Sequence, residues 1–385
     1  MTDAADLETT SLNDIFIPPS VHHDALLGGD SYTHFSSIPS ALLPSAPGAD
    51  DGVPCCLGVD EAGRGPVLGP MVYGVFYLPL TLSDPLLRQE HHFDDSKVLT
   101  PAVRSSLMQK LCTPPPPSPP ATTPQPAEGE GDGNGHTSPQ PTLYTHTGWA
   151  TTALSARSIS TAMYRPGTAY NLNAQAMDAT VALIRGVLAR GVNVREIYVD
   201  TIGPPATYQK RLERFFPSVR VTVAKKADSL YPCVSAASVC AKVTRDACLE
   251  VLYEQQLARA GGGRGGRGGR GGGRGGQNAD SEGKEGGGGI MAWGSGYPSD
   301  ARCVSWMRAN MHPLFGWGPE CRFSWGTAKD MIEAKGGAGV KVEWPVEDDG
   351  ETSRLTDFFV GIDDRDETAD ELGSWFGTPV ALETF

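Results

Sequence analysis

Residues 58–66 read Gly-Val-Asp-Glu-Ala-Gly-Arg-Gly-Pro, and this stretch sets the interpretation of the rest of the chain. The runs Cys56–Val59 and Met71–Tyr77 on either side of it are apolar and β-rich. We therefore expect two paired strands joined by a Gly-rich turn. Two adjacent carboxylates, Asp60 and Glu61, then stand at the end of a buried strand, where their mutual repulsion is costly unless a positive group lies beside them.

A hard divalent cation suits this pair, because Mg²⁺ prefers oxygen ligands and usually takes one or two protein carboxylates plus phosphate. An isolated Asp-Glu pair is more often a charged turn. The following Gly63-Arg64-Gly65 favours a functional site, since glycine lets a backbone approach a ligand closely and exposes its N–H groups. Such N–H groups could contact a ribose 2′-OH, the group that distinguishes RNA from DNA.

The pattern downstream alternates helices with strands, which indicates an α/β domain. Apolar residues at helical spacing predict a helix over Ala174–Arg190, with Asn173 as its N-cap and Gly191 as its stop. The further expected elements are a strand over Arg195–Val199 that ends at Asp200, a helix over Ala206–Phe216, a strand over Val219–Val223, and a long helix from Val234 to about Leu257.

Two further acids stand at the ends of these elements. Asp200 ends a strand, and open α/β sheets bind their ligands at strand ends of this kind. Asp228 precedes the long helix, where an aspartate alone is ordinarily a cap. The neighbouring Lys225 and Lys226 would bring phosphate to the same place. Four carboxylates around one sheet suit metal-assisted phosphodiester hydrolysis, and no Ser-His-Asp or Cys-His arrangement competes with them.

Composition separates a folded region from low-complexity segments. The 385 residues include 47 glycines and 31 prolines, which cluster. Such clusters mark linkers and insertions, because ordering them costs more entropy than they can recover by burial. We expect a disordered leader at 1–52, a catalytic domain at 53–335 with inserts at about 113–142 and 261–289, and an acidic tail at 336–385.

Charge and cysteine usage narrow the class of protein. The formal charge is −13, and residues 343–385 contribute −11 of it, so the remaining chain can still carry a basic binding face. The eight cysteines form no CxxC pair, which argues against structural zinc. No secretory leader and no membrane-length apolar run is visible, so a reducing compartment, cytosol or nucleus, is expected.

The motifs, taken in their order along the chain, resemble those of the catalytic A subunits of eukaryotic type 2 ribonucleases H, the ribonuclease HII family. The resemblance covers most of residues 55–335 once the two inserts are set aside. Its one local departure is Ser229, where the eukaryotic pattern usually has Ala. The matching segments are 60–66, Asp95-Ser96-Lys97, 170–173, 199–203, 227–231, 234–242 and 294–300.

The resemblance implies an α/β ribonuclease H-like fold, with a mixed five-stranded sheet flanked by helices, a small helical C-terminal region and disordered insertions. It implies hydrolysis of the RNA strand of RNA–DNA hybrids and cleavage 5′ of ribonucleotides embedded in duplex DNA, leaving 5′-phosphate and 3′-OH ends. It implies that four acids are catalytic and hold Mg²⁺ or Mn²⁺, namely Asp60, Glu61, Asp200 and Asp228. The substrate-binding residues that it implies are Gly63, Arg64, Gly65, Asp95, Ser96, Lys97, Lys242 and Tyr297.

The family also implies a cellular setting. Its eukaryotic members work in the nucleus, with the cytoplasm as a second location, in primer removal, mismatch repair and ribonucleotide excision. They form heterotrimers with two non-catalytic subunits and do not bind membranes. The apolar cluster Arg354–Phe359, in the acidic tail, is a candidate docking segment for those subunits.

Two alternative functions remain at this point. One is another nuclease on the same scaffold, such as a resolvase or transposase, which would share the acids but not the Gly-Arg-Gly turn. The other is a non-enzymatic RNA-binding protein that acts through the Gly-Arg insert, although that insert also fits a soluble spacer. Deleting residues 261–289 separates these possibilities, because we expect hydrolysis to survive with some loss of affinity at low salt.

Overall fold

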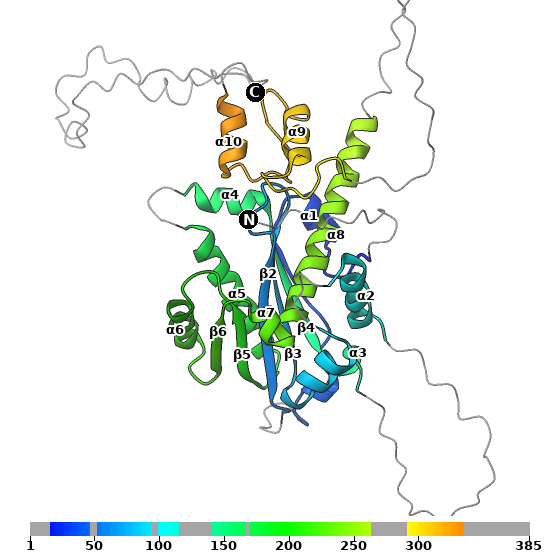
Figure 1. Cartoon of the computed structure of the whole chain (residues 1–385), viewed down its shortest axis with the longest axis vertical. Helices are drawn as coiled ribbons and strands as arrows, with labels where there is room; N and C mark the ends of the chain where they lie inside the picture. The colour runs from blue at the N-terminus through cyan, green and yellow to red at the C-terminus, as the bar shows by residue number, and fades with distance from the viewer. Residues whose placement is uncertain are drawn as a thin grey trace, which may run out of the picture. The chain divides into compact units, whose positions relative to one another are not determined.

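A six-stranded mixed sheet forms the centre of the fold in the computed structural model (Figure 1). The strand order is β1-β4-β3-β2-β5-β6, with β2 antiparallel to β3 and parallel to β5, and with β5 parallel to β6. The strands are β1 (Tyr32–Phe35), β2 (Cys55–Ala62), β3 (Met71–Pro79), β4 (Gly148–Leu154), β5 (Val194–Asp200) and β6 (Arg220–Ala224). The structure describes residues 16–46, 52–93, 99–114, 141–165, 170–262 and 291–334.

The helices follow the predicted alternation with the strands. The α-helices are α1 (His23–Leu27), α2 (Pro101–Cys112), α3 (Leu143–His146), α4 (Ala156–Met163), α5 (Leu172–Leu188), α6 (Pro205–Phe215), α7 (Ala227–Leu230), α8 (Pro232–Gly262), α9 (Ala301–Ala309) and α10 (Gly326–Glu333). Short helical turns lie at Ser40–Leu42, Leu80–Leu82 and Ser83–Glu90. None of the helices in the described part of the chain is both long and apolar enough to cross a membrane.

Part of the expected leader is folded, which corrects the prediction for residues 16–46. Strand β1 pairs antiparallel with β4, so the sheet has six strands where five were expected. Leu26 is buried in a cluster with α8, and the Ser20 hydroxyl bonds to the Thr244 hydroxyl at 2.7 Å. A four-residue strand shows no periodicity of its own, and its partner lies more than a hundred residues away, so the sequence could not reveal it.

The large inserts and the acidic tail cannot be compared in the same way. Most of 113–142, residues 263–289 and all of 336–385, including Arg354–Phe359, lie outside the described residues. Asp95-Ser96-Lys97 also lies outside them.

Helix α5 begins two residues earlier than predicted. Its N-cap is Asn171 and not Asn173, and the Asn171 side chain accepts hydrogen bonds from the N–H groups of Asn173 and Ala174 at 3.0 and 3.1 Å. Both asparagines suit an N-cap, so sequence alone does not choose between them. The side chain of Asn173 instead accepts a hydrogen bond from Arg64.

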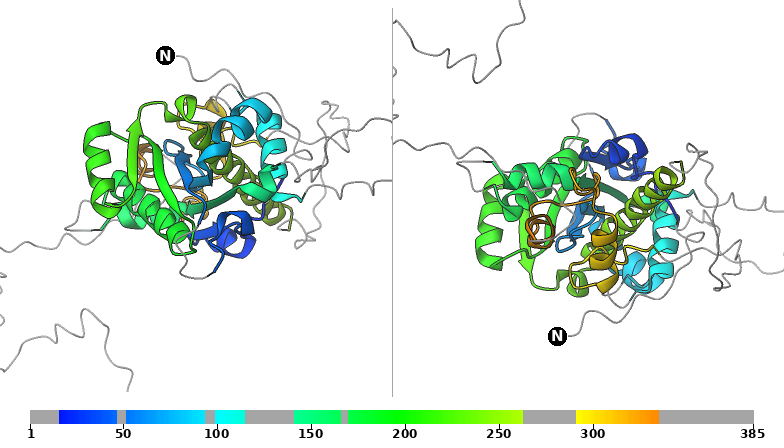
Figure 2. Two further views of the ribbon diagram at one scale, coloured as in Figure 1. Left: turned by 90° about the horizontal axis from the view of Figure 1, so that it is seen from below. Right: turned by 90° about the horizontal axis from the view of Figure 1, so that it is seen from above.

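Two hydrophobic cores cover the opposite faces of the sheet. One core packs α5 and α6 against one face through residues such as Val59 and Val199. The other packs α8 and α2 against the opposite face through residues such as Cys56 and Phe76. Figure 2, which views the structure from two ends, shows α5 and α6 on the other side of the sheet from α8.

Helix α8 lies unusually close to β2 and β3 because glycines face it. A Cβ on Gly58 would overlap the backbone of Cys233 and Val234, and a Cβ on Gly74 would lie 2.6 Å from the carbonyl oxygen of Ala237. Small residues on the helix complete this contact, since a larger side chain on either surface would separate the two backbones. Asp60 pairs with Gly74 in the ladder, so this close approach brings α8 directly over Asp60.

Candidate active site

Asp60 and Glu61 extend from β2 towards opposite faces of the sheet. Both lie within the strand, where successive side chains alternate. Asp60 is buried and forms a hydrogen bond with Ser238 of α8, while its Oδ1 also accepts from the N–H of Glu61 at 2.8 Å. Glu61 lies on the α5 side, where its charge raises the pKa of Tyr73 in addition to the larger effect of burial.

Asp200 and Asp228 are held by neighbouring backbone groups. Asp200 ends β5, and its Oδ1 accepts a hydrogen bond from the N–H of Ala227 at 3.0 Å. This bond fixes the start of α7, whose preceding residue Lys226 has a left-handed backbone conformation with φ of 55°. Asp228 lies within the short helix α7, which precedes α8. Its Oδ1 accepts a hydrogen bond from the N–H of Ser229 at 3.1 Å.

The four carboxylates share one electrostatic neighbourhood. Burial raises the pKa of Asp60, a hydrogen bond with Ser238 lowers it, and the charge of Asp200 raises it again. Burial also raises the pKa of Glu61, with further increases from Asp60 and Asp200. Burial raises the pKa of Asp200, and so does the charge of Asp228, whereas the hydrogen bond from the Ala227 N–H lowers it. Carboxylates that destabilise one another's charge in this way favour a cation among them.

The donor set therefore suits a hard divalent cation in its chemistry. In the part of the chain that the structure describes, no three His, Cys, Asp or Glu side chains converge closely enough to form a metal cluster. Asp60 and Glu61 themselves lie on different sides of β2, because successive side chains of a strand alternate.

Lys242 approaches the acids from α8, one helical turn after Ser238. Burial lowers the pKa of Lys242, while the charges of Asp60 and Asp228 raise it. The structure thus brings Lys242 to two of the predicted acids, and its role as a phosphate contact stays a prediction.

The turn at Gly63–Gly65 requires glycine at its first position. Gly63 has φ of 80°, a conformation that residues with a Cβ rarely adopt. A Cβ there would also overlap the side chain of Arg245 and lie 2.9 Å from the carbonyl oxygen of Pro70. A Cβ on Gly65 would lie 3.0 Å from the ring of Tyr297. The structure therefore places Tyr297 against the turn, as expected from the sequence.

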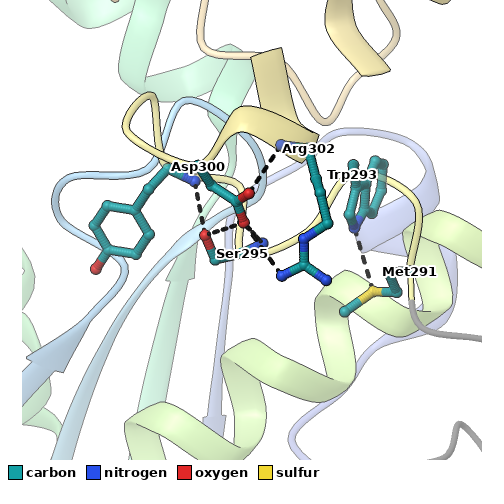
Figure 3. A network of polar contacts seen from close by, with 6 residues as sticks. Met291, Trp293, Ser295, Asp300 and Arg302 are labelled. Carbon is teal, nitrogen blue, oxygen red and sulfur yellow. Dashed lines mark hydrogen bonds and ion pairs between the residues drawn. The ribbon is translucent and has the colours of Figure 1, made fainter. Parts of the chain in front are cut away.

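The loop that carries Tyr297 is fixed by Asp300 (Figure 3). The Oδ2 atom of Asp300 accepts hydrogen bonds from the N–H and the hydroxyl of Ser295, both at 2.9 Å. The Oδ1 atom of Asp300 accepts one from the N–H of Arg302 at 2.9 Å. Burial raises the pKa of Asp300, but these hydrogen bonds outweigh that effect and lower the pKa to about 2. Asp300 also caps α9, so one carboxylate joins the loop to the helix that follows.

Sequence reasoning did not find two residues that contact this turn from the C-terminal region. The buried Arg322 side chain donates hydrogen bonds to the carbonyl oxygens of Gly63, Arg64 and Gly69, and Trp325 donates one to that of Gly65. The sequence offered no signal for them, because neither forms part of a recognisable chemical motif.

Comparison with known proteins shows the family of this chain. The Ribonuclease HII family profile matches residues 57–266. The A subunit of ribonuclease H2 from Neurospora crassa is 54% identical over 96% of this chain and 97% of its own. The protein of the same name from Schizosaccharomyces pombe is 36% identical over 94% and 89%. The crystal structure of ribonuclease H2 from Pyrococcus horikoshii OT3 covers 72% of this chain and 96% of its own at 24% identity, with a TM-score of 0.48.

A mixed sheet flanked by helices, with acids on its two adjacent central strands, defines a ribonuclease H-like α/β protein. The chain belongs to the ribonuclease HII family. It is a ribonuclease H, an enzyme that hydrolyses the RNA strand of RNA–DNA hybrids. Both alternative functions drawn from the sequence are thereby set aside.

Proposed function

We propose that Asp60, Glu61, Asp200 and Asp228 form the hydrolytic centre of this enzyme and hold Mg²⁺ or Mn²⁺. The observation that carries the proposal is the placement of these acids on the paired strands β2 and β5 and on α7, whose Ala227 N–H bonds to Asp200. The effect of their charges on one another supports it. A divalent cation at such carboxylates supplies positive charge that activates water and offsets the charge on a phosphate. The backbone N–H groups that bind Asp60, Asp200 and Asp228 orient these side chains.

We further propose that the turn Gly63–Gly65 recognises the ribonucleotide 5′ to the cut. Its glycines allow close approach of the backbone, and we assign the packing on the sugar to Tyr297, whose ring lies against Gly65. Arg64 Nη2 donates a hydrogen bond to Asn173, and we assign the contribution of Arg64 to recognition to its backbone N–H. Lys242 contributes a phosphate contact beside Asp60. Cleavage at this position leaves 5′-phosphate and 3′-OH ends.

The same assignment extends to the setting of the enzyme. The relatives are named as A subunits, which supports a complex with two non-catalytic subunits, and the docking of those subunits on Arg354–Phe359 stays a prediction. RNA–DNA hybrids and ribonucleotide-containing duplex DNA are the proposed substrates, and they support a nuclear role in primer removal and ribonucleotide excision. All eight cysteines are free thiols, in keeping with a reducing compartment.

A matched pair of duplexes tests the proposed specificity. We expect the full chain, assayed alone and with its partner subunits, to cut a DNA duplex containing one ribonucleotide on its 5′ side. The same duplex without the ribonucleotide should stay intact, because the turn then has no 2′-OH to contact. Mapping the product ends by gel and mass spectrometry measures both results. Equal cutting of the two duplexes would contradict recognition by the turn.

A further inference from the structure

Arg322 holds the turn through the backbone and not through another charge. Its guanidinium is fully buried, and Nε donates to the carbonyl oxygen of Gly69 at 2.9 Å. Nη1 donates to the carbonyl oxygen of Arg64 at 3.2 Å, and Nη2 to that of Gly63 at 2.6 Å. One rigid planar group therefore fixes two successive peptide groups of the turn and the peptide group of Gly69, which follows the turn in the chain.

The bound carbonyls determine where the N–H groups of the turn point. In a trans peptide the C=O of one residue and the N–H of the next point in opposite directions. Fixing the carbonyls of Gly63 and Arg64 on the Arg322 side therefore directs the N–H groups of Arg64 and Gly65 away from it. Among the described residues, no acceptor is bonded to either N–H. Both donors are thus oriented and available to a ligand.

Trp325 completes the contact on the same side of the turn. Its Nε1 donates to the carbonyl oxygen of Gly65 at 2.9 Å, and its ring lies 4.8 Å from the guanidinium carbon of Arg322. The next residue is Pro66, which has no N–H, so this bond fixes the end of the turn without adding a donor. All three carbonyls of Gly63–Gly65 are therefore bound by the C-terminal region.

The charge of Arg322 is also unusual. Within the described residues the Arg322 guanidinium forms no ion pair with a carboxylate. The charged group that acts on it is another guanidinium, that of Arg245. Burial, and next Arg245, lower the pKa of Arg322. Burying a cation that is bonded only to neutral carbonyls is costly to stability. Packing alone therefore does not explain this choice of residue.

We propose that Arg322 is a positioning residue for recognition of the ribose 2′-OH, and that Trp325 supports it. This inference rests on the proposed function of the turn. Arg322 does not touch the substrate. It holds the peptide groups so that the N–H groups of Arg64 and Gly65 face the sugar before substrate arrives, which removes the cost of ordering them on binding.

Binding of two duplexes by the full chain tests this inference. The Asp200→Asn variant serves as the parent, because its expected slow cleavage leaves the duplex intact during the measurement. Fluorescence anisotropy gives Kd for a duplex with one ribonucleotide and for the all-DNA duplex. Arg322→Lys keeps the charge but loses the fork. We expect it to lower the preference for the ribonucleotide by about ten-fold, the effect of losing about one hydrogen bond to the ligand. Affinity for the all-DNA duplex should be unchanged.

Trp325→Phe provides a second variant if Arg322→Lys does not fold, and its preference should fall less, by about three-fold. Trp317→Phe is the matched control. It removes a similar indole bond, from Nε1 to the carbonyl oxygen of Met307 at 2.8 Å, which is not a carbonyl of the turn, and should keep the parental preference. A parent without any preference would overturn the proposed recognition together with this inference. A parental preference that Arg322→Lys and Trp325→Phe both retain would overturn the inference alone.

Discussion

Asp200→Asn is expected to reduce turnover on an RNA–DNA hybrid by at least about 1,000-fold, or ~4 kcal/mol of activation free energy. Asparagine keeps the shape of the side chain, and its oxygen can still accept the hydrogen bond from Ala227, so β5 and α7 should keep their contact. Only the negative charge is lost. Single-turnover kinetics with saturating enzyme measure the chemical step, and anisotropy measures binding.

Hybrid binding by the same variant should change by less than about three-fold, because the substitution does not alter Lys242, the phosphate contact that we propose. Glu213→Gln is a suitable control, since it removes an exposed charge on α6 that bonds to Gln209 at 2.9 Å. That variant should keep wild-type turnover. Turnover of Asp200→Asn within about ten-fold of the wild type would remove Asp200 from the catalytic centre.

Gly63→Ala should produce the second large effect, a loss of at least about 100-fold in kcat/KM on a single-ribonucleotide duplex, ~2.7 kcal/mol. The positive φ disfavours alanine, and the new methyl group would overlap Arg245. The turn must shift to relieve this overlap, which moves its N–H groups away from the sugar. We also expect a decrease of about 2–4 kcal/mol in the free energy of unfolding, from strain and overpacking together.

Gly326→Ala is the matched control for this variant. A Cβ at Gly326 meets nothing within 4 Å and lies at the start of α10, so stability should change by about 0.5 kcal/mol or less. Urea denaturation gives the free energies of unfolding, and kinetics are measured where both variants are folded. Gly63→Ala with wild-type kcat/KM would show that the turn tolerates displacement and does not position the substrate.

The sequence predicted the acids and the turn because both are local. Asp60 and Gly63 lie in one short stretch, and Asp200 ends a strand whose apolar run is legible on its own. Strand β1 and Arg322 were missed for the opposite reason. β1 has four residues and depends on pairing with β4, and Arg322 acts on a carbonyl 259 residues away. Only the folded chain brings such residues together.

The direction of side chains within the site was also beyond the sequence. The adjacent Asp60 and Glu61 suggested a pair at the end of a strand, whereas β2 continues to Ala62 and turns the two to opposite faces. The close approach of α8 through Gly58 and Gly74 determines which of them meets Ser238.

The most direct test of the account is to locate Mn²⁺ by anomalous diffraction in crystals of the full chain with a ribonucleotide-containing duplex. The proposed function predicts an anomalous peak about 2.0–2.6 Å from carboxylate oxygens of both Asp60 and Asp200, beside the phosphate that follows the ribonucleotide. A Mn²⁺ peak coordinated elsewhere, with Asp60 and Asp200 both outside its ligand sphere, would contradict it.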